Sequence, residues 1–90
     1  MNVQELERVF KKLELRFEDI LNGFDLDTMQ MMSKACVTLE AKTKLDELVV
    51  TSVEVRAMIL DDIRMIQHNL KCINNAIKLK ELRFDVISLN

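Results

Sequence analysis

From Ile59 to Ile87 an apolar residue recurs at every third or fourth position, with Lys80 as the one polar exception and no proline or glycine. This spacing gathers apolar side chains on one face of an α-helix, and such a face has to be buried against other helices. We therefore expect a helix over residues 52–83, which at 1.5 Å per residue is about 48 Å long.

The rest of the chain favours helices as well. Proline is absent, glycine occurs once, and four phenylalanines are the only aromatic residues among 90 that are 49% hydrophobic. A domain of this size buries only roughly 60 to 65% of its unfolded surface, so a partner would add stability. The sequence predicts one all-α domain over residues 1–90. We expect a three-helix antiparallel bundle, or a hairpin with a long C-terminal helix, that forms oligomers through coiled-coil-like packing.

Two shorter helices are expected before the long one. The first runs from 3 to 21, and Gly23 follows it as a residue able to end a helix in the left-handed conformation. The second runs from 28 to 49, with Asp25 or Asp27 accepting hydrogen bonds at its start. The seam of the first helix consists of Val3, Leu6, Phe10, Leu13, Phe17, Ile20 and Phe24.

The second helix and its junction with the third are less regular. Its apolar line meets Thr43, which leaves a bend, a wide buried face or a break all open. Residues 49–55 alternate as a strand does, but no second strand candidate exists to pair with them. Thr51 and Glu54 instead fit a capping box, so we expect a tight junction, with continuity of the two helices left undecided.

The long helix has a second apolar line, formed by Met58, Met65, Cys72, Leu79 and Val86. The two lines together span about 160° of the helix, wider than the roughly 100° needed to face one core, so the helix should touch two neighbours. Asp62 and Asn69 lie between the lines. Either they form a polar layer that fixes register or oligomer number, or they face a solvated gap; the rarity of fully buried charges favours the gap.

Length and charge both point to a partner. A helix of about 48 Å extends past one of about 28 Å, which leaves apolar residues exposed as an interface. Acidic residues dominate 40–62, whereas the distal part of the long helix is basic, so two copies could pair antiparallel. The expected partner contacts are Met58, Ile59, Ile66, Ile73, Leu79, Phe84 and Ile87.

Catalytic and metal sites find little support. The chain has no phosphate-binding glycine loop and no nucleophile motif, so we expect no enzyme activity and no cofactor. His68 and Cys72 are four residues apart, yet a single histidine without a paired CxxC is a poor basis for zinc. We expect Cys36 and Cys72 to be free thiols in a cytoplasmic protein, because no signal peptide or membrane span is recognisable.

Nucleic acid is a weaker alternative. Arg64, Lys71 and Lys78 align at seven-residue spacing and are candidates for phosphate contacts, but acidic residues interrupt the line and the net charge is -2. We expect a binding protein, either an adaptor or an assembly or export chaperone that covers an amphipathic helix of a partner or of itself. The alternative is a dimeric DNA-binding or nucleoid-associated regulator.

Overall fold

The computed structural model describes residues 2–89, with the side chains of Asn2 and of residues 4–83. Over this range the chain contains α1 (Val3–Lys12), α2 (Phe17–Gly23), α3 (Leu26–Val49) and α4 (Val53–Leu89), and residues 2–89 include no strand. The all-α prediction is confirmed, and so is a long C-terminal helix that packs on the others. Four helices are present where three were expected.

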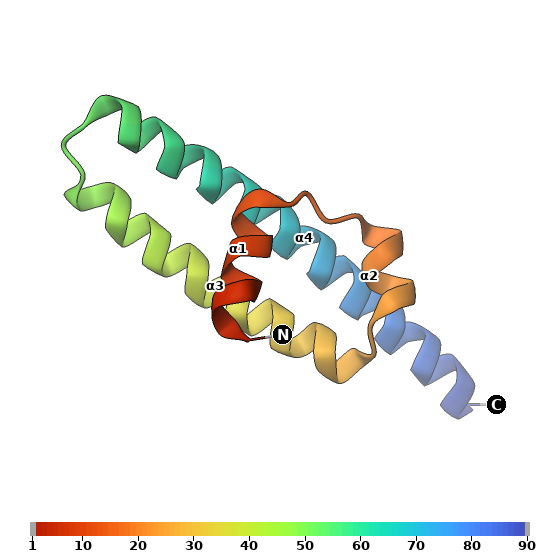
Figure 1. Ribbon diagram of the computed structural model, residues 1–90. Coiled ribbons are helices and arrows are strands. Elements are labelled where there is room, and N and C mark those ends of the chain that lie inside the picture. The colour runs from red at the N-terminus through yellow and green to blue at the C-terminus, as the bar shows by residue number, and fades with distance from the viewer. Residues whose placement is uncertain (1, 90) are drawn as a thin grey trace.

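The two long helices form a hairpin (Figure 1). α3 is continuous through Thr43, so the helix has no break at this position. The buried Thr43 hydroxyl donates to the Leu39 carbonyl oxygen at 2.7 Å, and its hydrogen bond is therefore satisfied within the helix. α3 and α4 are separate helices, joined through residues 50–52. At the start of α4 the Ser52 hydroxyl accepts from the Val55 amide at 3.4 Å, so Ser52 takes the place expected for Thr51.

The expected single helix over residues 3–21 is wrong. The chain leaves the helix at Leu13 and resumes it at Phe17, and both Leu13 and Arg16 have extended backbone conformations. We call residues 2–24 the N-terminal arm. In Figure 1 the arm crosses the hairpin with α1 near its middle and then turns to place α2 beside α4.

Local preferences do not explain this break, because residues 13–16 are Leu, Glu, Leu and Arg, all good helix formers. Packing explains it. The change of direction lets α1 contact both α3 and α4 while α2 contacts α4, and it buries Phe10, Ile20 and Leu21. The apolar area removed from water outweighs the few helical hydrogen bonds that are lost.

The core lies where the arm covers the hairpin. Its buried members are Phe10, Ile20, Leu21, Met29, Met32, Cys36, Leu39, Ile66, Ile73 and Ala76. The molecule measures 57 × 21 × 19 Å, and the arm covers only part of that length. The end of the hairpin, around the 50–52 turn, lies beyond the arm in Figure 1.

Candidate functional site

Asn69 on α4 holds the broken segment of the arm. Its side chain is fully buried, and its Nδ2 donates to the carbonyl oxygens of Phe10 at 2.9 Å and of Leu13 at 2.8 Å. Its Oδ1 accepts from the Leu15 amide at 2.9 Å. These backbone groups belong to the end of α1 and the connection that follows, where helical partners are lacking. One side chain therefore satisfies three groups that the break leaves free.

Lys80 does the same for the end of α2. Its Nζ donates to the carbonyl oxygens of Leu21 at 3.3 Å and of Phe24 at 3.1 Å. The expectation that Gly23 would close this helix in a left-handed conformation is wrong, because Gly23 has no positive φ and is the last residue of α2. A cation from α4 replaces the glycine cap, which also suits the negative end of the helix dipole.

The two residues expected between the apolar lines of α4 both contact the arm. Asp62, with 19% of its side chain exposed, forms an ion pair with Lys12 at 2.9 Å. The solvated gap favoured from the sequence is wrong for Asn69, which is 0% exposed. Asn69 is stable in the core because backbone groups of the arm satisfy its amide. These hydrogen bonds fix the position of the arm on α4, and they are contacts within one chain.

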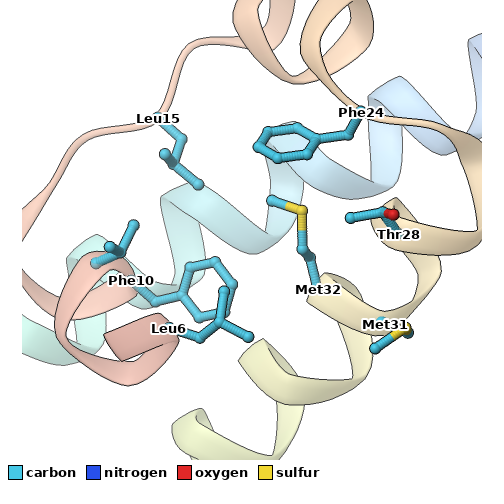
Figure 2. Close-up of a pocket in the computed structure, with 8 residues that line it drawn as sticks. Leu6, Phe10, Leu15, Phe24, Thr28, Met31 and Met32 are labelled. Carbon is cyan, nitrogen blue, oxygen red and sulfur yellow. The ribbon is translucent and has the colours of Figure 1, made fainter. Parts of the chain in front are cut away.

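An apolar pocket opens between the arm and the start of α3. Its volume is about 250 Å³. The residues that line it are Leu6, Val9, Phe10, Leu15, Phe24, Thr28, Met31 and Met32. Figure 2 shows Leu15 and Phe24 on one side, Phe10 and Leu6 on the other, and Met32 reaching between them from α3. Thr28 brings the one hydroxyl among these side chains.

A second apolar surface lies at the free end of the hairpin. We call it the hairpin-end surface, and it consists of Leu45, Leu48, Val49, Val53, Val55 and Met58. Leu48 is 71% exposed, Val49 77% and Val53 82%, the three highest values among the exposed large hydrophobic side chains described. The concentration of exposed aliphatic residues at one end of the hairpin makes that end a candidate interaction site.

The residues expected to contact a partner along α4 differ in how far they are buried. Ile66 and Ile73 are fully buried in the core of the chain, so the prediction that they line an open groove is wrong: the arm and α3 occupy that face. Leu79 is half-buried against the same core. Met58 is 62% exposed and Ile59 half-buried, both near the free end. Phe84 and Ile87 lie outside the described side chains.

The predicted phosphate contacts Arg64, Lys71 and Lys78 are all exposed. Arg64 forms an ion pair with Asp61 at 3.2 Å, and both side chains are more than 70% exposed. Lys71 and Lys78 border one shallow depression, but Glu40 from α3 borders it too. The carboxylate offsets part of the positive charge that a phosphate would meet, and no further support for a nucleic-acid surface comes from this face.

The two cysteines are free thiols in different settings. Cys36 is buried, its Sγ donates to the Ile66 carbonyl oxygen at 3.4 Å, and burial raises the pKa of its thiol to about 11. Cys72 Sγ lies 3.6 Å from His68 Nε2, and the same nitrogen lies 3.6 Å from a Glu14 carboxylate oxygen. Among the described residues no group of three or more His, Cys, Asp or Glu side chains is arranged to hold a metal ion.

Sequence patterns did not reveal the apolar pocket. Its residues come from α1, the connection after it, the end of α2 and α3, so no short segment carries the pattern. The sequence predicts that Leu6, Phe10 and Phe24 share the seam of one helix. The break at 13–16 changes the direction of the chain, and this change brings the three residues to the walls of one pocket. The exposed position of Met31, by contrast, follows from its place off the buried line of α3.

Comparison of the chain with protein-family models, with curated proteins and with solved structures found no match. Over residues 2–89 no helix combines the length and apolar character needed to cross a membrane. The function is therefore inferred from the surfaces of this chain alone.

Proposed function

We propose that this protein is a binding module, an adaptor or assembly chaperone, that holds an amphipathic helix of a partner protein at the hairpin-end surface. The supporting observation is the exposure of Leu48, Val49 and Val53, each more than 70% accessible near the 50–52 turn, which lies beyond the arm in Figure 1. When a partner removes exposed aliphatic side chains from water, the free energy falls by about 25 cal/mol per Å² of buried apolar area.

Charge around this surface favours a particular kind of partner. Asp46 and Glu54 are exposed beside the apolar residues, while Arg56 is already paired with Glu47 at 3.3 Å. Packing the ends of two copies together would bring these acidic groups close to one another, which costs free energy. A helix with lysine or arginine beside its apolar face would instead find complementary charge.

The position of the surface differs from the groove expected along α4. The middle of α4 is covered by the arm through Asn69 and Lys80, and among the described residues the most exposed aliphatic side chains lie toward the start of α4 and the end of α3. Met58, one of the expected contacts, belongs to the hairpin-end surface and remains in the proposal.

The first measurement is the absolute mass by light scattering over a wide range of concentration, at low and high salt. We expect a monomer in dilute solution whose association at high concentration is weakened by Val49→Ser with Val53→Ser. A stable dimer that this double substitution dissociates would contradict the proposal, because a second copy would then occupy the surface.

The second measurement uses two labelled amphipathic peptides of about 18 residues, long enough to form helices. Both carry the same leucine face, and the polar face is basic in one and acidic in the other. We expect the basic peptide to bind roughly tenfold more tightly at low salt, and to lose binding with the double substitution. Val37→Ser, at a 50% exposed position of α3 outside the surface, is the matched control and should leave binding unchanged. Equal binding of both peptides, or of neither, would contradict the proposal.

A further inference from the structure

The apolar pocket has the size of a site for a small molecule. An engineered cavity of about 150 Å³ lined by aliphatic and aromatic side chains stays dry and binds benzene, so a pocket of about 250 Å³ has room for a larger apolar molecule. An apolar guest that fits the pocket would make dispersion contacts with its walls, and binding to the folded state would stabilise this small domain.

The lining determines the chemistry of the ligand. Seven of the eight side chains are apolar, two of them phenylalanines, and the two methionines are flexible and polarisable enough to adapt to a guest. The Asp25 carboxylate accepts from the Thr28 amide at 2.8 Å, beside the one hydroxyl of the lining. The apolar walls disfavour any charged group, and an anionic group at that rim would in addition meet this carboxylate, so a neutral ligand is favoured.

The pocket depends on the break in the arm. Leu15 lies in the connection between α1 and α2, and Phe10 lies in the last turn before it. Asn69 binds the Phe10 carbonyl and the Leu15 amide, so one buried side chain fixes two walls of the pocket. A continuous helix over 3–21 would carry Phe10 and Leu15 five residues apart, about 140° around the helix, on different faces.

We propose that this pocket binds one small, neutral, apolar molecule of about ten non-hydrogen atoms, with an aromatic ring or a branched hydrocarbon body. Asn69 is a positioning residue for the site, because it holds Phe10 and Leu15 through their backbones without touching the ligand. The pocket is built by the arm and α3, and the site is therefore separate from the hairpin-end surface.

The probe is n-butylbenzene, compared with 4-phenylbutanoate, which has a similar body with a carboxylate. Binding is followed by amide chemical shifts in ¹⁵N-labelled protein and by the rise of the unfolding temperature with ligand concentration. We expect n-butylbenzene to shift the amides around Leu6, Val9, Leu15 and Met32 and to raise Tm, and 4-phenylbutanoate to bind at least roughly tenfold more weakly. No saturable shifts with n-butylbenzene, or equal binding of both probes, would overturn the proposal.

Substitutions locate the site. Val9→Trp should fill the pocket and abolish binding, whereas Arg8→Trp, which carries the same indole at an exposed position of α1, should leave it intact. Met31→Trp at the 67% exposed rim is the second blocking variant and is tolerated even if Val9→Trp fails to fold. Undiminished binding in a folded blocking variant would place the ligand elsewhere and refute the assignment.

Discussion

The two halves of the α3–α4 hairpin are built from similar residues and end in opposite environments. Where the arm covers it, Leu39, Ile66 and Ile73 are at most 1% exposed. Toward the 50–52 turn, Leu48 and Val53 are more than 70% exposed. Two helices in contact leave much of each apolar face open, and a third layer closes it. The arm supplies that layer for one half only, so the other half keeps its apolar side chains exposed.

The largest expected difference between the halves is in core substitutions. Phe10→Ala removes a fully buried ring of the covered half and should lower the free energy of unfolding by about 3 to 5 kcal/mol. Val53→Ala, at the free end, should change it by less than about 0.5 kcal/mol. Urea unfolding followed by circular dichroism measures both. A comparable loss from Val53→Ala would mean that the free end is packed in solution.

Asn69→Ala should have the next largest effect, about 2 to 4 kcal/mol of destabilisation, because it leaves buried backbone groups of the broken segment without partners. Asn75→Ala removes the same side chain from an exposed position of α4 and should cost less than about 0.5 kcal/mol. Similar values for the two variants in urea unfolding would show that Asn69 does not hold the arm.

The Cys36 thiol makes stability depend on pH in the covered half. Its pKa is raised from 9.0 to about 11 by burial, so above pH 9 the unfolded chain releases this proton while the folded chain keeps it. Stability should therefore fall by about 1 kcal/mol per pH unit between pH 9 and 11 from this group. The measurement is the difference in slope between the natural protein and Cys36→Ala; parallel slopes would contradict the assignment.

The smallest effect is expected for the cap of α2. Lys80→Met keeps the apolar stem and removes the two hydrogen bonds to the carbonyl oxygens of Leu21 and Phe24, at a cost of about 1 kcal/mol. Lys78→Met, two residues earlier and exposed, serves as the control and should be nearly neutral. The amides of α2 should also exchange with solvent faster in Lys80→Met. Unchanged exchange would rule out the cap.

The sequence was sufficient for the elements whose signal is local. Apolar periodicity predicted the helical class and the long C-terminal helix, and of the two expected caps, Asp25 and Asp27, it is Asp25 that accepts from the Thr28 amide at 2.8 Å. These features depend on residues within a turn or two of one another. The break at 13–16 depends instead on Asn69, which is more than fifty residues away. The helix propensities of Leu, Glu, Leu and Arg give no indication of a break.

The candidate sites follow the same division. Met58 was expected to contact a partner because it belongs to the second apolar line of the long helix, and its side chain is 62% exposed. Ile66 and Ile73 were expected in a partner groove because they lie on the apolar seam of the long helix, and both are 0% exposed because the arm and α3 cover that seam. The apolar pocket exists only because distant segments meet, so it could be found only once the fold was known.

The contacts of Asn69 also bear on how the chain is made. Its three backbone partners precede it by 54 to 59 residues, so the arm leaves the ribosome long before the residue that holds it. At about 5 to 20 residues per second, Phe10 waits several seconds without its final cover. The arm therefore cannot make these contacts until α3 and the part of α4 up to Asn69 have been synthesised.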